Sequence, residues 1–356
     1  MDERAANGDL NSPEYWNRRF VVDWTAEGGP LQTVFFAELC VRELPQWLVD
    51  EVCDRRLSIF DYGCAFGDAL PVWRRLFPQS SIAGGDVAQA ALGTARRLYP
   101  DFAFTNLSGA ELNGGDDGGP LADLVYCSNT LEHFADWRAV LDRLARRAGH
   151  FVVVMVPFEE EAPVEEHAAS FEYDTLPPCL PSGHRLLHLV VVDAAAEPDS
   201  QWNGLQLVAV YGRERPAGRR DGLPAREAAA GTASPRTMVF DLRDIGAAAL
   251  GPLFANLAAM SRERRRIAAA AEAAETEAFH LKTSEAEAVD RALVLRLTLT
   301  GVLREYADLV RGLEKAQQWV IGRLAEFDPQ LEADHDLPPI AAEWPAAGDD
   351  FDAGHR

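Results

Sequence analysis

Short apolar segments alternate with helix-forming segments between residues 57 and 156, and this alternation limits the fold more than any other feature. The apolar segments are residues 57–61, 81–86, 102–105, 122–127 and 151–156. Apolar residues at helical spacing lie between them, in residues 68–77, 88–98 and 137–148. Strands that alternate with helices predict a doubly wound α/β sheet whose strands are mostly parallel.

The strongest strand signal is FVVVMV, residues 151–156, which is apolar on both faces, as expected of a central parallel strand. Two further strands are predicted at residues 186–192 and 205–211, with no helix-forming segment between them. One of these two strands is therefore expected to run antiparallel to its neighbours.

A glycine turn follows the first predicted strand, in the segment FDYGCAFGD, residues 60–68. Gly63 and Gly67 carry no Cβ, so the backbone there can approach a ligand closely. Asp86 ends the second predicted strand about 20 residues further on, where a carboxylate can accept both hydroxyls of a ribose. The spacing predicts a nucleotide-type cofactor at the carboxyl edge of the sheet.

The charge of the turn discriminates between cofactors. Asp61 lies inside the turn and Asp68 at its end, and the G-x-G-x-x-G spacing that presents backbone amides to a pyrophosphate is absent. A cofactor that carries an ammonium and a sulfonium suits these acids better than one that carries phosphates. S-adenosylmethionine is such a cofactor.

Four segments resemble the successive cofactor motifs of the class I S-adenosylmethionine-dependent methyltransferases: FDYGCAFGD, AGGD, ADLVYCSNTLEHF and FVVVMVPF. The similarity covers residues 13–212 and implies a seven-stranded, Rossmann-like sheet with one antiparallel member. The residues that it implies as cofactor ligands are Asp61, Gly63, Gly67, Asp86 and Asn129. The segment from Asn129 to His133 is implied to line the cofactor and face the acceptor. Ala65 departs from the family, which usually has glycine there.

Two other segments resemble parts of family members. Residues 13–33 are similar to leaders that fold over the cofactor, and residues 157–171 resemble the acceptor-side loop of members that act on sugars or other small polar molecules. The resemblance therefore implies a small-molecule or glycan acceptor. His133 and His167 are the candidate catalytic residues, because a hydroxyl acceptor gains most from a base with a near-neutral pKa. Carboxylates such as Glu166 would orient the imidazole ring.

Each of these residues also has a purely structural interpretation. Asp86 could cap a helix, Asp61 could stabilise the glycine turn, and Asn129 could form a turn after its strand. The two glycines are needed by the turn with or without a ligand. His167 could form a surface ion pair, while the aromatic residues at 15, 16 and 24 could cap the cofactor or belong to the core. No metal site is expected, since no helix-spaced or cysteine-based ligand pattern occurs.

The organisation along the chain predicts a cofactor-binding domain with an N-terminal cap over residues 1–213 and a Pro-, Gly- and Ala-rich linker over 214–235. A helical region is predicted over 236–328, and an acidic, disordered tail over 329–356. Apolar residues recur at alternating intervals of three and four between 303 and 327, with Gln317 among them. This heptad seam favours a coiled coil and a homo-oligomer; the alternative is a helix folded onto the catalytic domain.

The composition limits the partners. Lys plus Arg is 34 and Asp plus Glu is 56, so the net charge of −22 disfavours nucleic acid. The five cysteines form no C-x-x-C pair, the N-terminal segment is polar, and no apolar run approaches the roughly 20 residues that a bilayer requires. A cytoplasmic protein without a membrane span is expected.

The sequence thus predicts an S-adenosylmethionine-dependent methyltransferase that acts on a small polar acceptor, with a hydroxyl of a sugar, a polysaccharide intermediate or a natural product as the favoured target. Two alternatives stay open: a nicotinamide-dependent oxidoreductase on the same sheet, and a non-catalytic cofactor-binding domain of a coiled-coil assembly protein.

Overall fold

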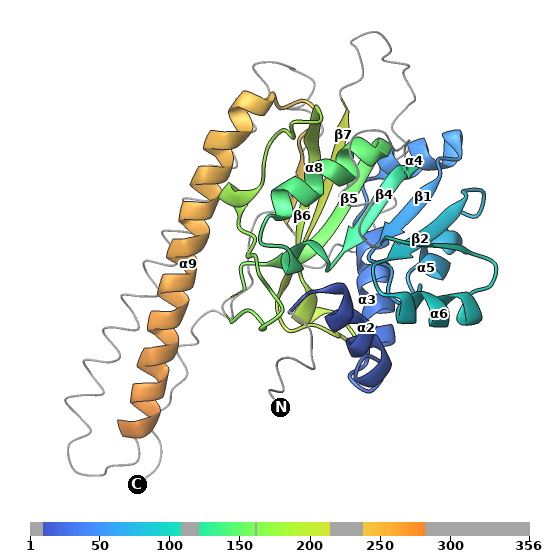
Figure 1. Ribbon diagram of the computed structural model, residues 1–356. Coiled ribbons are helices and arrows are strands. Elements are labelled where there is room, and N and C mark those ends of the chain that lie inside the picture. The colour runs from blue at the N-terminus through green and yellow to red at the C-terminus, as the bar shows by residue number, and fades with distance from the viewer. Residues whose placement is uncertain (1–9, 108–120, 161, 214–237, 282–356) are drawn as a thin grey trace. The chain divides into compact units, whose positions relative to one another are not determined.

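The computed structural model describes residues 10–107, 121–160, 162–213 and 238–281 (Figure 1). The chain divides into two compact units, residues 1–251 and 252–356. The predicted linker, heptad seam and acidic tail lie outside the described residues.

The first unit contains a mixed sheet in the strand order β3-β2-β1-β4-β5-β7-β6-β8 (Figure 1). Its strands are β1 (Ile59–Tyr62), β2 (Ile82–Asp86), β3 (Ala103–Asn106), β4 (Ala122–Ser128), β5 (Ala148–Phe158), β6 (His184–Asp193), β7 (Leu205–Arg213) and β8 (Met238–Asp241). Strands β1 to β5 are parallel, and β7 is antiparallel to both β5 and β6. The predicted doubly wound sheet and its antiparallel member are confirmed.

The sheet has eight strands among the described residues, one more than the seven expected. The additional strand, β8, pairs antiparallel with β6 at the edge of the sheet. It is four residues long, and its side chains are exposed or half-buried. Its apolar run is only three residues long, Met238 to Phe240, and is shorter than the apolar segments by which the other strands can be recognised. It also places a strand at the start of the segment predicted to be helical.

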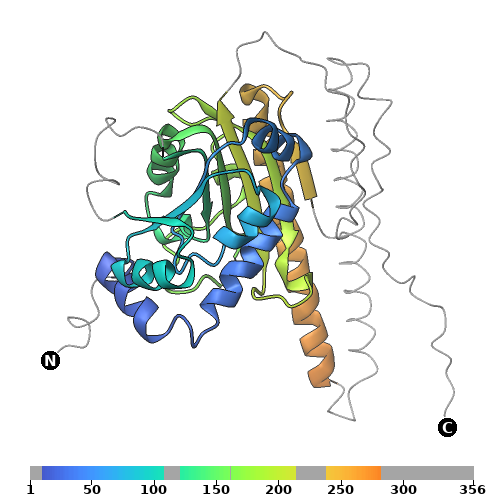
Figure 2. The ribbon, with the colours of Figure 1, turned by 90° about the vertical axis from the view of Figure 1, so that its right-hand side faces the viewer.

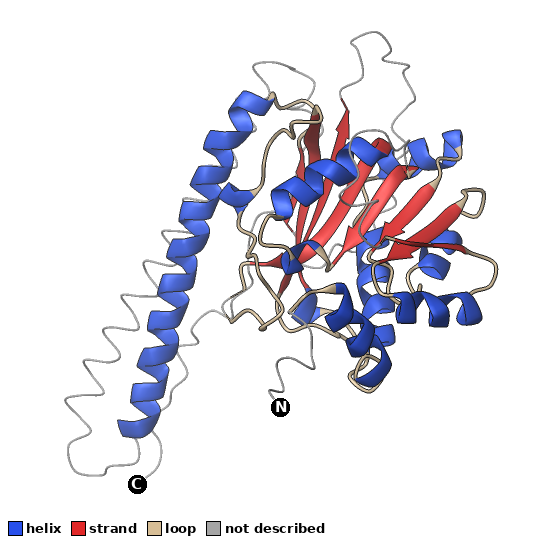
Figure 3. Ribbon diagram, in the orientation of Figure 1, coloured by secondary structure: helices blue, strands red, loops and turns tan. Residues whose placement is uncertain are grey.

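Helices cover both faces of the sheet (Figures 2 and 3). The helices α3 (Gly29–Arg42), α4 (Gln46–Arg55) and α5 (Leu70–Leu76) share one apolar core with β4 and β5, to which Leu124 and Val153 contribute. Neighbouring strand residues such as Val125 and Val152 point to the opposite face, which α8 (Trp137–Arg147) covers. Two covered faces explain why β5 is apolar at nearly every position.

The remaining elements are short, apart from one long helix. The helices α2 (Pro13–Val22) and α6 (Gln89–Leu98) lie beside each other (Figure 1), and the turns η1 (Leu131–His133), η2 (Tyr173–Thr175) and η3 (Ala194–Ala196) connect larger elements. Helix α9 (Ala247–Leu281) begins in the first unit, and the second unit starts within it. Among the described helices, none has both the length and the apolar character required to cross a bilayer.

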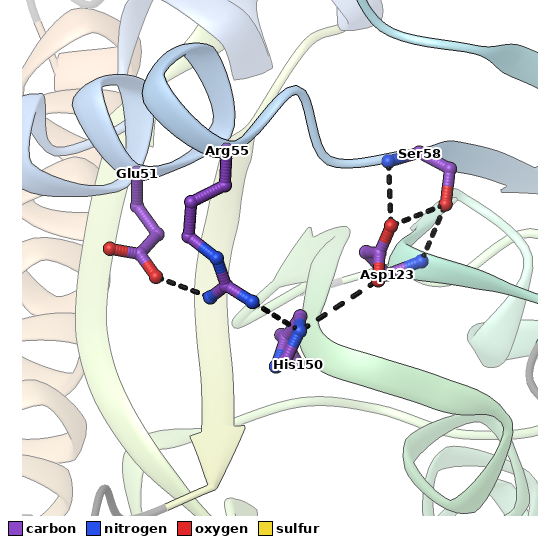
Figure 4. A network of polar contacts seen from close by, with 5 residues as sticks. All are labelled: Glu51, Arg55, Ser58, Asp123 and His150. Atoms are coloured by element: carbon purple, nitrogen blue, oxygen red, sulfur yellow. Dashed lines mark hydrogen bonds and ion pairs between the residues drawn. The ribbon is translucent and has the colours of Figure 1, made fainter.

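The strands on either side of the point where the strand order reverses are joined at their amino ends by a polar network (Figure 4). The backbone amide and hydroxyl of Ser58 donate to Asp123 Oδ2 at 2.9 and 2.7 Å, and the Asp123 amide donates back to Ser58 Oγ at 3.0 Å. Arg55 donates to His150 Nε2 at 2.7 Å, and this nitrogen lies 3.7 Å from Asp123 Oδ1. Partial burial opposes ionisation of Asp123, but the Ser58 donors lower its pKa. This network fixes β1 against β4 at the edge opposite the glycine turn.

Replacement of Asp123 by Ala should lower the free energy of unfolding by about 1 kcal/mol, because both Ser58 donors lose their acceptor. Urea denaturation at pH 7 measures this loss. The control is Asp54→Ala, which removes an exposed acid from α4 and should change stability by less than about 0.5 kcal/mol. Equal effects of the two substitutions would contradict the role given to Asp123.

Candidate functional site

The turn between β1 and α5 requires both of its glycines. Gly63 has φ +81° and Gly67 has φ +84°, a left-handed conformation that other residues rarely adopt. A Cβ on Gly63 would lie 2.5 Å from Thr130 Oγ1, and one on Gly67 would lie 2.8 Å from the Phe104 ring. The turn after β1 therefore contacts the segment after β4, and two of the segments predicted to bind cofactor lie side by side.

Asp86 joins this turn to the start of α6. Its side chain is buried, with Oδ2 accepting from the Ala65 amide at 2.9 Å and Oδ1 from the Ala88 amide at 2.8 Å. Burial raises the pKa of Asp86 to about 6, and the backbone donors oppose that increase. The Val87 backbone amide is a third donor to this carboxylate, which has about four acceptor positions, so one position remains for a ligand hydroxyl. The capping interpretation and the ribose-binding interpretation are therefore compatible.

Ala65, the departure from the family pattern, adopts φ +49°. The turn accepts its methyl group, which packs with Phe20, Phe66, Ala88 and Ala91 in a small apolar cluster. The hydrogen bond from the Ala65 amide to Asp86 holds the residue in this left-handed conformation, which is unfavourable for an alanine.

Asp61 lies on β1 close to Asp86. It is 4% exposed and pairs in register with Gly84 of β2. Burial raises the pKa of Asp61 to about 8, with a further contribution from the charge of Asp86. A cation placed beside this pair would favour the charged form of both carboxyls. Asp68, at the end of the turn, is buried and accepts from the Tyr99 hydroxyl at 2.7 Å.

Asn129 follows β4 with φ +44°, a conformation in which asparagine is enriched. Its backbone amide donates to the Met155 carbonyl at 2.8 Å, and its side-chain amide donates to Ser128 Oγ at 3.0 Å. The side chain thus has a structural partner, and the adjoining Thr130 contacts the glycine turn.

Helix α2 packs over the glycine turn. The Phe20 ring lies 5.7 Å from Phe66 and 5.9 Å from Trp16, and Phe20 also contacts Trp24 at 4.9 Å. Asn17 Oδ1 accepts from the Ala90 amide at 2.8 Å and so caps α6 from another helix. The aromatic residues of the N-terminal segment form a cluster with the turn, consistent with a leader that folds over this site.

The structure brings the two candidate histidines together, with ring centroids 5.5 Å apart. His133 lies 4.8 Å from the Trp16 ring, and its Nδ1 donates to the Glu166 carbonyl at 3.0 Å. Burial lowers the pKa of His133 to about 4, so this imidazole is neutral at pH 7.

The carboxylate that contacts His167 is that of Glu160, not that of Glu166 as expected. His167 Nδ1 contacts both carboxylate oxygens of Glu160, at 2.8 and 2.9 Å. The Glu166 carboxylate instead accepts from the Tyr15 hydroxyl at 2.7 Å and lies 3.9 Å from Arg19. Glu160 is one of three consecutive glutamates, so the sequence could point to the acidic loop but not to this member of it.

The sequence also did not predict that Glu132 is a buried acid of this site. Its side chain is 1% exposed, and Oε2 has no hydrogen-bond partner within the described part of the chain. Burial raises the pKa of Glu132 to about 8. It lies in the predicted segment between Asn129 and His133, but its burial depends on the fold and leaves no signal in the sequence.

A polar cavity of about 380 Å³ opens between α2 and the loop after β5. Its lining residues are Tyr15, Arg18, Arg19, Asp23, Glu27 and Glu166. Arg19 is paired with Glu27 at 2.6 Å, and Glu166 connects the cavity to His133 through its carbonyl. Such a lining suits a small polar molecule better than an apolar one.

Residues 60–149 match the family model of a methyltransferase domain. Trans-aconitate 2-methyltransferase from Methylobacterium nodulans is 28% identical over 145 residues, which are 40% of this chain and 53% of the relative. The chain therefore spans about half the length of that curated relative.

Similar solved structures include magnesium protoporphyrin IX methyltransferase from Synechocystis with bound S-adenosylhomocysteine (TM-score 0.38, 13% identity, 60% of this chain and 100% of that one). Another is a putative methyltransferase in complex with the Trm112 activator of Haloferax volcanii (TM-score 0.42, 15% identity, 60% of this chain and 100% of that one). A third is the plantazolicin methyltransferase BpumL with S-adenosylhomocysteine (TM-score 0.40, 12% identity, 57% of this chain and 92% of that one).

Replacement of Gly63 by Ala should destabilise the fold by about 2 kcal/mol or more, from the left-handed backbone and the clash with Thr130. In a double-mutant cycle, Thr130→Ala should recover part of that loss, because it removes two of the three nearest atoms. Urea unfolding measures the cycle. Gly93→Ala is the control, since nothing lies within 4 Å of a Cβ there and the helix should gain stability. Strict additivity of the two substitutions would contradict the contact.

The raised pKa of Asp61 predicts a pH dependence of stability. The folded state binds this proton more tightly than the unfolded state, so the stabilisation is complete below the unfolded pKa near 4 and is lost as pH rises through about 8. Relative to Asp61→Asn, wild type should lose about 1 kcal/mol or more between pH 5 and pH 8. Urea denaturation at several pH values tests this, with Asp54→Asn as control. Parallel pH profiles for wild type and Asp61→Asn would refute it.

Proposed function

We propose that this chain is a class I S-adenosylmethionine-dependent methyltransferase that transfers a methyl group from that donor to a small polar acceptor. The favoured acceptor is a hydroxyl of a sugar, a polysaccharide intermediate or a natural product. The observation that carries the proposal is the pair of buried acids, Asp61 and Asp86, beside a glycine turn that α2 covers.

The chemistry of this pair fits the donor. S-adenosylmethionine supplies a methyl group on a positively charged sulfur, and it also carries an ammonium group and a ribose. We assign the ribose to Asp86, because its carboxylate lies at the end of β2 and keeps an acceptor position after it binds the neighbouring backbone amides. Asp61 provides the negative charge that a cation requires, and Gly63, Gly67 and Asn129 shape the backbone around the ligand.

The acceptor is assigned to the polar cavity between α2 and the loop after β5, because the backbone carbonyl of its lining residue Glu166 accepts from His133, which contacts His167. Five of the six lining residues are charged and the sixth is Tyr15, and this lining favours a polar acceptor. Because alignment of donor and acceptor supplies much of the acceleration in such a displacement, a cavity next to the covered turn is well placed.

A carboxylate acceptor is the second candidate. It is favoured by the similarity to trans-aconitate 2-methyltransferase and by Arg18, an exposed cation in the cavity lining. A carboxylate is already ionised at neutral pH, so its methylation needs no base, whereas that of a hydroxyl does.

A transfer assay separates these acceptors. The full chain is incubated with methyl-labelled S-adenosylmethionine and, in separate reactions, with nucleotide sugars, hydroxy acids and trans-aconitate. Label in a nucleotide sugar would support the hydroxyl acceptor, and label in trans-aconitate alone would favour the carboxylate.

Calorimetry with S-adenosylhomocysteine and with NAD tests the donor. Wild type should bind the former and not the latter. Asp86→Asn should weaken binding of S-adenosylhomocysteine by about 1–3 kcal/mol, because the amide has one acceptor oxygen in place of two. Asp101→Asn, an exposed acid after α6, is the control and should bind as wild type does. Binding of NAD alone would support the oxidoreductase alternative and refute the methyltransferase.

A further inference from the structure

We propose that Glu160 and His167 form a carboxylate–imidazole pair in which His167 Nε2 takes the proton of a hydroxyl acceptor and Glu160 is the positioning residue. This inference rests on the proposed function and deepens it, since it identifies the base and thereby the class of acceptor. The carboxylate role moves from Glu166, which the sequence suggested, to Glu160.

The geometry fixes which ring nitrogen is available. His167 Nδ1 lies 2.8 and 2.9 Å from the two carboxylate oxygens of Glu160, and both side chains are largely buried, at 6% and 9% exposure. An ionised carboxylate only accepts hydrogen bonds, so Nδ1 carries the hydrogen. The lone pair of the neutral ring is therefore on Nε2, the nitrogen that can receive a proton.

The ring is held from several sides. Trp202 stacks on it with centroids 6.1 Å apart and an angle of 26° between the planes. The His167 amide donates to the Val164 carbonyl at 3.0 Å, and the next two amides donate to the Glu132 carbonyl at 2.8 and 3.0 Å. A base that is fixed in this way loses little entropy when it meets an acceptor.

A continuous set of aromatic contacts connects the pair to the glycine turn. Phe66 of the turn contacts Phe20, which contacts Trp16, and Trp16 contacts His133. His133 in turn contacts His167 at 5.5 Å. Helix α2 thus packs against the glycine turn through Phe20 and against His133 through Trp16.

The neighbouring titratable groups suit a base. His133 donates from Nδ1 to a carbonyl and is neutral, so it places no positive charge against His167. Glu132, whose backbone carbonyl anchors the same loop, has a raised pKa and lies near Glu160, which contributes to that increase. Glu160 therefore provides the negative charge that directly contacts the ring.

The step balances without a further reactant. The hydroxyl oxygen forms a bond to the methyl carbon, the bond between that carbon and the donor sulfur breaks, and the sulfur keeps the electron pair as a neutral thioether. The hydroxyl proton passes to His167 Nε2. The resulting imidazolium is stabilised by Glu160 through Nδ1, and it returns the proton to solvent afterwards.

Nuclear magnetic resonance of ¹⁵N-histidine-labelled full-length protein, saturated with S-adenosylhomocysteine, tests the pair directly. With signals assigned through His167→Gln, wild type at pH 8 should show the Nδ1–H tautomer. Glu160→Ala should lose this preference, and Glu160→Gln, which keeps an acceptor oxygen, should largely restore it. The control, Glu165→Ala, removes an exposed glutamate of the same loop and should match wild type.

A ring that stays doubly protonated to pH 9, or one with its hydrogen on Nε2, would overturn the inference, because neither form can take a proton at Nε2. Calorimetry with S-adenosylhomocysteine on the same samples separates this failure from failure of the proposed function. A wild-type ring that lacks the Nδ1–H tautomer although S-adenosylhomocysteine binds refutes only the pair, whereas absence of binding in wild type refutes the donor site.

Kinetics provide the second arm. For a hydroxyl acceptor found by the transfer assay, His167→Gln should lower kcat by about 10²-fold or more, with little change in KM for the donor. Glu160→Gln should lower kcat less and move the acidic limb of the pH–rate profile to lower pH, because the imidazolium loses its carboxylate. Unchanged kcat in both variants, or methylation of carboxylates only, would refute a base.

Discussion

The arrangement of the candidate site depends on one interaction, the pair of hydrogen bonds through which the Asp86 carboxylate holds the Ala65 and Ala88 amides. These bonds join the turn after β1 to the start of α6 across neighbouring parallel strands. They keep a carboxylate with a raised pKa at the carboxyl edge of the sheet, where open α/β folds bind ligands. The left-handed backbone of Ala65 and the packing of α2 on the turn both follow from this arrangement.

The two edges of the sheet differ in how their buried polar groups are paired. At the amino ends of the strands, Ser58 and Asp123 satisfy each other's polar groups. At the carboxyl ends, Asp61 and Glu132 are buried with raised pKa values. Burying such groups destabilises the folded state unless a partner compensates them, and in proteins this cost is concentrated at functional sites. The contrast between the two edges supports a ligand site at the second.

Much of the sheet could be predicted from the sequence because its signals are local. The FVVVMV run, the glycine turn and the helical spacing between strands each depend on neighbours within a few residues. The same holds for Asp86, whose position at a strand end follows from the preceding apolar segment. Strand β8 could not be predicted, since its apolar run is only three residues long.

The acceptor side was harder because its contacts are long-range. That His133 and His167 are neighbours depends on how the loop after β5 returns to η1, and that Glu160 contacts His167 depends on a turn within a run of acids. The contact of Asn17 with α6 joins residues 73 positions apart. No periodicity in the sequence reports such contacts.

The central claim is that Asp86 binds the ribose and Asp61 the positively charged part of one donor molecule. A crystal structure of the full chain with bound S-adenosylhomocysteine tests it most directly. We expect a ribose hydroxyl within hydrogen-bond distance of the Asp86 carboxylate, and the ligand's amino group nearer to Asp61 than to any other acid. Density for the ligand elsewhere, with both carboxyls still enclosed by protein alone, would contradict the claim.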